Sequence, residues 1–164
     1  MEIMQAENGD LAEILELQYR AFQSEAELAG DYAIPPLLQT LPEFEAEFRR
    51  GIVLKAVDES GQIIGSVRAY AENGTLYIGK LIVHPDFQGR GTGTRLLAAI
   101  ETRCPQPRYE LFTGDKSAGN LRLYEKQGYR PFAEKEIKPG LRFIYLEKNA
   151  GTGAAPVRDP TSGQ

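Results

Sequence analysis

Residues 75–104 restrict the possible folds of this chain more than any other segment. They combine a strand that is apolar on both faces, a glycine-rich turn and an amphipathic helix. The apolar side chains of the strand, residues 75–83, are Leu76, Ile78 and Ile82 on one face and Tyr77, Leu81 and Val83 on the other. A strand of this kind is typical of a sheet interior that is covered on both sides. We therefore expect a central strand in a sheet with helices on both faces.

The rest of the chain supplies the other elements of such a sheet. Alternating apolar patterns predict further strands over residues 3–6, 52–57, 63–72, 109–113, 129–137 and 141–148. Helical periodicity and capping residues predict helices over 11–23, 41–51, 92–104 and 117–127, with a loop over 24–40 that has room for a short helix. Three consecutive hairpin strands argue against a purely parallel doubly wound sheet. We expect an α/β (α+β) fold: a mixed, mostly antiparallel sheet of about seven strands, flanked by about four helices.

Composition narrows the class of protein. The length of 164 residues with 41% hydrophobic content suits one domain, expected over 1–149, and residues 150–164 read as a Gly/Pro/Ala-rich tail. Nineteen basic against 23 acidic residues give a net charge of −4, which argues against coating nucleic acid or an anionic membrane. One Cys and one His exclude an internal disulfide and a His-rich metal site, so we expect no metal. With no ~20-residue apolar run and no leader pattern at Met1, we expect a cytoplasmic protein.

The turn between the central strand and its helix, Gln88–Thr94, has the residues of an anion site. Its glycines let a ligand approach the backbone, and the free N–H groups of the first helical turn favour a phosphate or pyrophosphate. A nucleotide P-loop would need a Lys that is missing here, and the dinucleotide fingerprint would need a glycine where Thr94 stands. The alternative is a strand-to-helix connection that binds nothing.

Two segments resemble the signatures of one family. Leu81–Gly93, LIVHPDFQGRGTG, resembles the acetyl-CoA-binding motif of the GNAT N-acetyltransferases: a strand ending in Val, then Gln/Arg-x-x-Gly-x-Gly/Ala opening a helix. Asn120–Tyr129, NLRLYEKQGY, resembles the second signature, Asn…Leu-Tyr-x-x-x-Gly-Phe/Tyr. The resemblance covers about residues 1–148. It implies the GNAT-like fold, acetyl-CoA as co-substrate and transfer of the acetyl group to a primary amine.

The resemblance also implies a role for each matching position. Backbone groups of Leu81, Ile82 and Val83 would pair with the pantetheine arm, in a gap between the strands ending at Val83 and Thr113. The pyrophosphate would lie on the N–H groups of Gln88, Gly89, Arg90, Gly91, Thr92, Gly93 and Thr94. Asn120 would contact the cofactor, and Tyr124 would point at the thioester sulfur as general acid. A phenol of pKa ~10 suits protonation of a thiolate. The other interpretation of Tyr124 is core packing, because Leu121 shares its helical face.

The general base is not evident. Many relatives carry a Glu on the strand before the turn, but Tyr77, Gly79 and Leu81 occupy those alternate positions. Glu110 on the next strand, or a relayed water, is the candidate, whereas His84 beside Pro85 reads as structural. The first hypothesis is an N-acetyltransferase in which the amine attacks the thioester of acetyl-CoA directly. The second is a GNAT-like module that holds an acyl-CoA as a sensor or scaffold with little turnover.

The acceptor is expected to be a small-molecule amine or a peptide or protein amine. Its pocket is expected beside residues 24–41 and 131–142. Glu25, Glu27 and Asp31 in the first of these segments would suit a cationic amine, with a solvated acidic loop as the alternative. The assembly state is left open, with a homodimer as one option.

Overall fold

The computed structural model describes residues 1–150, and the tail expected over 150–164 lies almost wholly outside them. Seven strands form one sheet: β1 (Glu2–Gln5), β2 (Ile52–Val57), β3 (Ile63–Glu72), β4 (Thr75–Val83), β5 (Arg108–Gly114), β6 (Arg130–Lys138) and β7 (Leu141–Asn149). The helices are α1 (Leu11–Ala21), α2 (Gln23–Ala29), α3 (Pro35–Leu38), α4 (Leu41–Arg50), α5 (Thr92–Arg103) and α6 (Ala118–Lys126). Short 3₁₀ turns, η1 (Asn8–Asp10) and η2 (Pro85–Phe87), precede α1 and the glycine-rich turn.

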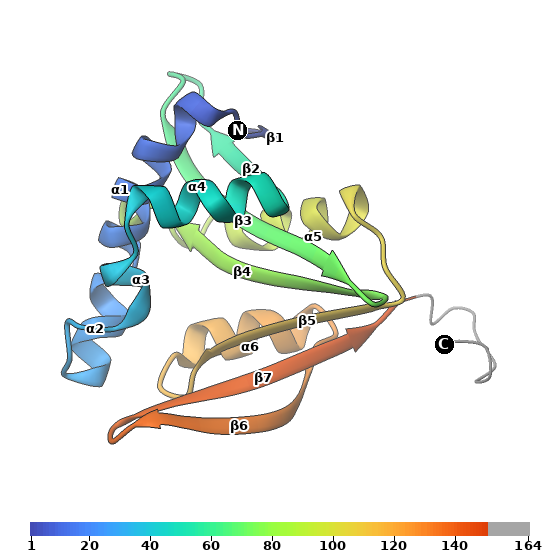
Figure 1. Ribbon diagram of the computed structural model, residues 1–164. Helices are drawn as coiled ribbons and strands as arrows, with labels where there is room; N and C mark the ends of the chain where they lie inside the picture. Colours follow the sequence, from blue (N-terminus) through green and yellow to red (C-terminus); the bar gives the residue numbers. More distant parts are fainter. Residues whose placement is uncertain (151–164) are drawn as a thin grey trace.

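The strand order is β1-β2-β3-β4-β5-β7-β6 (Figure 1). Every neighbouring pair is antiparallel except β4 and β5, which run parallel. The expected mixed, mostly antiparallel sheet of seven strands is therefore confirmed, with β4 at its centre. After β5 the chain continues through α6 and β6, and β7 then pairs with β5. The hairpin of β6 and β7 therefore forms one edge of the sheet.

The segment between the first two long helices is more helical than its sequence predicts. The described residues hold six α-helices, because α2 and α3 occupy the expected loop. Gly30 ends α2 with a φ of 66°, and Pro35 begins α3 at a position where a missing N–H costs nothing. Each of the two helices is at most seven residues long, which is too short for a helical period to stand out in the sequence.

Two cores lie on opposite faces of the sheet. On one face α5 and α6 pack Leu96, Leu97 and Tyr124 against strands β2 to β5 and β7. On the other face α1 and α4 pack around Ile14 and Phe44. Figure 1 shows α4 crossing one face of the sheet and α5 lying behind it. No helix among residues 1–150 is both long and apolar enough to cross a membrane.

The centre of the sheet opens between β4 and β5. The two strands pair at Thr75–Arg108, Leu76–Tyr109 and Tyr77–Glu110 and then diverge (Figure 1). Beyond Tyr77 the edge of β4 that faces β5 therefore has no ladder partner. A β-bulge accompanies this divergence, because two β4 residues, Lys80 and Leu81, stand opposite Val67 alone. Lys80 adopts a φ of 49°, which is rare for a residue with a side chain.

Candidate functional site

Three adjoining cavities follow the divergence of β4 and β5. The turn cavity lies between the end of β4, the glycine-rich turn and α6. The central cavity lies between β4, β5, α2, α3 and the start of β7. The α4 cavity lies between α4, β3 and the paired ends of β4 and β5. Leu81 and Asn120 line both the turn and central cavities, and Gly79 and Lys80 line both the central and α4 cavities. The three cavities are therefore neighbours along the separation of β4 and β5, and we call this row of cavities the path.

Nearly all of the predicted cofactor-binding residues meet at the turn cavity. Its lining includes Leu81, Ile82, Val83, Gln88, Gly89, Gly91, Thr92, Gly93, Thr94 and Asn120. The exceptions are Tyr124, which lines the central cavity instead, and Arg90, whose guanidinium lies over the Phe87 ring, 5.0 Å from its centroid, on another part of the surface. The predicted role of Arg90 rests on the backbone, and the structure gives its side chain no place in this cavity.

The conformation of the turn explains its glycines. Gly89 and Gly91 have φ values of 78° and 82°, and a Cβ added at either would meet no atom within 4 Å. The space beside the backbone is therefore open to a ligand. Gly91 is the residue before α5, so the free N–H groups and positive dipole end of that helix face the same space. This cradle fits a diphosphate.

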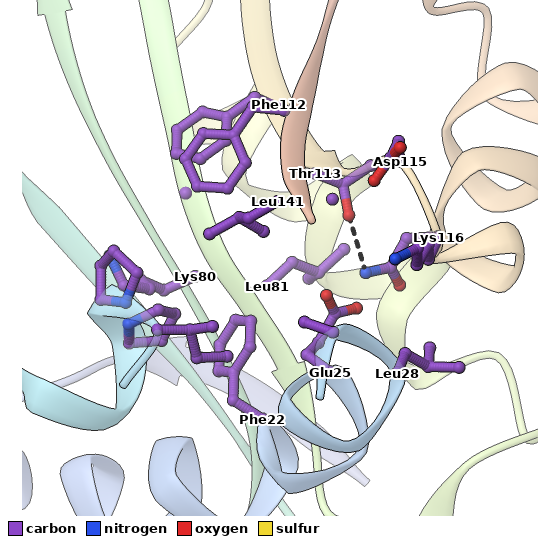
Figure 2. Close-up of a pocket in the computed structure, with 18 of the residues that line it drawn as sticks. Phe22, Glu25, Leu28, Lys80, Leu81, Phe112, Thr113, Asp115, Lys116 and Leu141 are labelled. Atoms are coloured by element: carbon purple, nitrogen blue, oxygen red, sulfur yellow. Dashed lines mark hydrogen bonds between the residues drawn. The ribbon is translucent and has the colours of Figure 1, made fainter. Parts of the chain in front are cut away.

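Asn120 and Tyr124 project from α6 toward the path. The Asn120 side-chain amide donates to the Thr113 hydroxyl at 3.2 Å, the bond dashed in Figure 2, which fixes the amide between β5 and the turn cavity. Tyr124 is 5% exposed and lines the central cavity. Burial raises the pKa of its hydroxyl, and the negative charge of Glu25 raises it further. The phenol therefore stays protonated at neutral pH.

Tyr124 also packs in the core, so both interpretations of this residue describe part of its surroundings. Its ring lies 6.2 Å from the buried Tyr129 ring, and it belongs to the core cluster beneath α5. The cavity it borders is otherwise largely apolar. Figure 2 shows Phe22, Phe112 and Leu141 around this space from three different elements. The site is therefore a protonated phenol beside a mostly apolar cavity whose lining also includes the charged residues Glu25, Lys80, Asp115 and Lys116.

Glu110 lies at the other end of the path, in the α4 cavity. Its carboxylate accepts a hydrogen bond from Arg108 at 2.8 Å, and the same guanidinium contacts Glu147 at 2.8 Å. Glu47, from α4, lines this cavity as well and pairs with Arg68 at 2.7 Å. The structure thus separates the two candidate catalytic residues: Tyr124 borders the central cavity and Glu110 the α4 cavity.

Several lining residues were not among the predicted site residues. Arg68 is 6% exposed, stacks on the Phe44 ring at 3.8 Å, and also contacts Gln18, Gln39 and Glu47. A single arginine among the apolar and small residues at 63–69 of β3 was the available signal. Lys80 gave no such signal, because its position depends on the bulge in β4.

The expected acidic acceptor loop does not converge on one pocket. Asp31 pairs with Lys138 of β6, whereas Glu27 is solvent-exposed. Glu25 does line the turn and central cavities and accepts a hydrogen bond from the Ser117 hydroxyl. One of the three carboxylates therefore borders the path, which removes the basis for a cationic acceptor held by all three.

His84 has the structural role expected for it. Its Nδ1 accepts a hydrogen bond from the Asp86 N–H at 3.0 Å, and its Nε2 lies 3.1 Å from the Arg20 guanidinium. The buried ring thereby anchors η2, which sets the start of the glycine-rich turn. Residues 1–150 hold no cluster of three His, Cys, Asp or Glu side chains that could bind a metal ion.

Solved structures share this fold. YncA from Salmonella typhimurium, solved with acetyl-CoA as its cofactor, superposes with a TM-score of 0.71 at 21% identity, over 97% of this chain and 99% of that one. A phosphinothricin acetyltransferase from Sinorhizobium meliloti, in complex with acetyl-CoA, gives 0.73 at 19% identity, over 99% and 97%. The architecture is therefore that of the GNAT acetyltransferases.

The sequence comparison identifies the family itself. The acetyltransferase (GNAT) family profile matches residues 11–129, and this chain belongs to that family of acyltransferase enzymes. The UPF0157 protein YqkA of Bacillus subtilis is 27% identical over 143 residues, which cover 86% of this chain and 41% of YqkA. The chain thus spans about two fifths of the length of this curated relative.

Proposed function

We propose that this protein transfers the acetyl group of acetyl-CoA to an amine, with the two substrates entering the path from opposite ends. The observation that carries the proposal is the row of adjoining cavities at the point where β4 and β5 separate. The donor would occupy the turn and central cavities. The amine would approach from the α4 cavity and meet the thioester beside Gly79 and Lys80, which border both.

The residues of the turn cavity suit the parts of acetyl-CoA. The N–H groups of the turn and of the first turn of α5 would hold the pyrophosphate, in the space that Gly89 and Gly91 leave open. The unpaired edge of β4 over Leu81–Val83 offers backbone groups to an extended arm with amide groups, as an added strand would. Asn120, fixed by Thr113, would position the arm between the two strands.

Acetyl-CoA supplies the thioester. The amine nitrogen would attack its carbonyl carbon, and the C–S bond would then break. Tyr124, which its raised pKa keeps protonated at neutral pH and which borders the central cavity, would give a hydrogen bond or its proton to the departing thiolate sulfur. The acceptor's ammonium group must lose a proton before its nitrogen can attack, and this proton needs a base on the α4 side. Glu110 would serve there, directly or through water, in a position where Arg108 orients its carboxylate.

The proposal is tested by acetyl-CoA binding and by CoA release. Gly91→Val should abolish acetyl-CoA binding in a calorimetric titration, because the added side chain would fill the space of the pyrophosphate. Gly61→Val is the matched control, since Gly61 also has a positive φ, of 90°, and open space around it, but lies in the turn between β2 and β3. Both variants carry similar backbone strain.

The control separates loss of the site from loss of the fold. We expect Gly61→Val to bind acetyl-CoA normally and Gly91→Val to fold without binding it. Wild-type affinity in folded Gly91→Val would refute the placement of the pyrophosphate. Tight acetyl-CoA binding by the wild type without CoA release over a broad amine panel would refute the transferase and leave the acyl-CoA-binding module.

A further inference from the structure

The α4 cavity carries a charge pattern that the proposed reaction does not by itself explain. Its volume is about 340 Å³, enough for a small amine. Three cationic side chains line it, Arg50 from α4, Arg68 from β3 and Lys80 from β4, against the two carboxylates of Glu47 and Glu110. The cavity therefore has an excess of positive charge, although the chain as a whole carries a net charge of −4.

The two carboxylates are already neutralised by other groups. Glu47 accepts hydrogen bonds from Arg68 at 2.7 Å and from the Gln39 amide at 3.0 Å. Glu110 pairs with Arg108, which does not line the cavity. Both carboxylates therefore already have a positively charged partner, and neither adds an unpaired negative charge to the cavity.

The cations, in contrast, have unused capacity. Within the part of the chain that the structure describes, neither Arg50 nor Lys80 has a carboxylate partner. The central carbon of the Arg50 guanidinium lies over the Tyr70 ring, 4.5 Å from its centroid, and its N–H groups have no carboxylate partner in this part of the chain, so they are available for an anion. Lys80 is partly buried on the bulge, and its desolvation together with the nearby charge of Arg68 lowers its pKa.

A buried donor at the same place lacks a partner. The Arg68 residue is 6% exposed. Its Nε has no hydrogen-bond partner within residues 1–150, whereas its other two guanidinium nitrogens are hydrogen-bonded. Buried N–H groups are normally satisfied, by protein, water or ligand. An anionic group bound in this cavity would lie beside Arg68 and supply the positive cluster with its missing counter-charge.

We propose that the acceptor is an amine that also carries a carboxylate, as an amino acid does, and that Arg50 and Lys80 bind this carboxylate in the α4 cavity. The inference rests on the proposed acetyl transfer and names the substrate class for it. The carboxylate would lie toward the end of α4, and the amine would point to Gly79, where the α4 cavity adjoins the central cavity. A guanidinium suits this task because it binds a carboxylate through two parallel N–H bonds.

The experiment compares acceptors that differ only in the anion. CoA release is measured with L-methionine and L-phenylalanine and with their carboxamides, at saturating acetyl-CoA. The carboxamides have less basic amines, which are more available as nucleophiles at neutral pH. A preference for the free acids therefore cannot come from the amine itself. We expect kcat/KM to be higher for at least one acid than for its carboxamide.

Arg50→Gln then tests the assigned residue, with Arg49→Gln as a matched control on the same helix end, exposed and outside the cavity. We expect Arg50→Gln to raise KM for the preferred acid about tenfold or more, the usual scale for losing a charged hydrogen bond. The KM for acetyl-CoA and the activity of Arg49→Gln should not change. The carboxamide should respond little to either substitution.

The outcomes separate the two proposals. Carboxamides that react as well as their acids, or an unchanged KM for the acid in Arg50→Gln, would overturn the acidic acceptor and leave acetyl transfer standing. If acetyl-CoA binds but no amine of either kind releases CoA, the proposed transfer fails and the acceptor class falls with it.

Discussion

Tyr124 shows how one side chain joins packing to chemistry. The ring completes a core cluster with Tyr129, while the residue borders the central cavity. Burial that stabilises the helix also disfavours the phenolate, so the same environment that holds the ring keeps the hydroxyl protonated. The raised pKa keeps this proton in place at neutral pH and makes the phenol a weaker acid, so in the proposed reaction Tyr124 would stabilise the thiolate by a hydrogen bond or by giving up its proton.

Replacing Tyr124 by Phe keeps the packing and removes the proton. We expect kcat to fall roughly 10²–10⁴-fold, with acetyl-CoA affinity nearly unchanged. Tyr129→Phe is the control, because it removes a buried hydroxyl bonded to Glu101 at 2.6 Å, away from the cavities. It should lower stability without lowering kcat. Wild-type turnover of Tyr124→Phe would leave this residue with core packing alone.

The pH dependence of kcat follows from the same residue. The functional form is the protonated phenol, and its pKa is raised above the ordinary value of 10.0. The proton is therefore retained throughout pH 7–9.5. Turnover should rise with pH as the ammonium acceptor loses its proton, and should show no descending limb in this range. A descending limb that disappears in Tyr124→Phe would show that the pKa of Tyr124 is not raised.

At the scale of elements, a buried polar network joins α1 to β3 and to the segment before α4. Gln18 is fully buried, and its amide donates to the Pro36 carbonyl at 2.8 Å and to the Gln39 side chain at 3.1 Å. Its carbonyl oxygen accepts a hydrogen bond from Arg68. The network holds Arg68 beside the α4 cavity and ties α3 to the sheet.

Gln18→Leu should destabilise the fold, because it leaves the Pro36 carbonyl and an Arg68 nitrogen buried without partners. We expect a loss of about 1–3 kcal/mol in the free energy of unfolding, measured by urea denaturation. Gln23→Leu, at an exposed position of α2, is the matched control and should change the free energy by no more than about 0.5 kcal/mol. An equal effect in both variants would mean that the network adds nothing to stability.

At the scale of the whole molecule, the segment between β1 and α1 makes one charged contact with the sheet. The Lys55 ammonium on β2 donates to the Asp10 carboxylate at 2.7 Å, and the Glu7 N–H donates to the same oxygen at 2.8 Å. Burial raises the pKa of Asp10, but the two hydrogen bonds and the charge of Lys55 outweigh burial and lower it below 3.8.

A lowered pKa in the folded state fixes the direction of the pH effect. The folded protein binds the Asp10 proton less readily than the unfolded chain, so this contact stabilises the fold above about pH 4. The stabilisation is lost as the pH falls through the folded-state pKa. Asp10→Asn should therefore lower the free energy of unfolding at pH 7, with the difference from wild type shrinking below pH 4. A difference that stays constant down to pH 3 would contradict the assignment.

The sequence by itself determined the centre of this protein. The two apolar faces of β4, the glycine-rich turn and the period of α5 are patterns of neighbouring residues, and they predicted the central strand and the anion cradle. The signature residues Leu81–Val83, Gln88, Gly89 and Gly91–Thr94 line the turn cavity for the same reason, whereas Asn120 reaches it from α6 through tertiary packing. Within such a short segment, local geometry largely fixes which backbone groups face one another.

Only the tertiary structure decided the acceptor side. Arg50, Arg68 and Lys80 come from three elements, and they meet because α4 packs across β3 and because β4 bulges opposite Val67. The pairing of Asp31 with Lys138, more than 100 positions away, likewise withdrew a carboxylate from the expected acceptor loop. Which charges remain unpaired depends on partners brought together by packing and on how deeply each is buried, and neither property can be read from the order of residues along the chain.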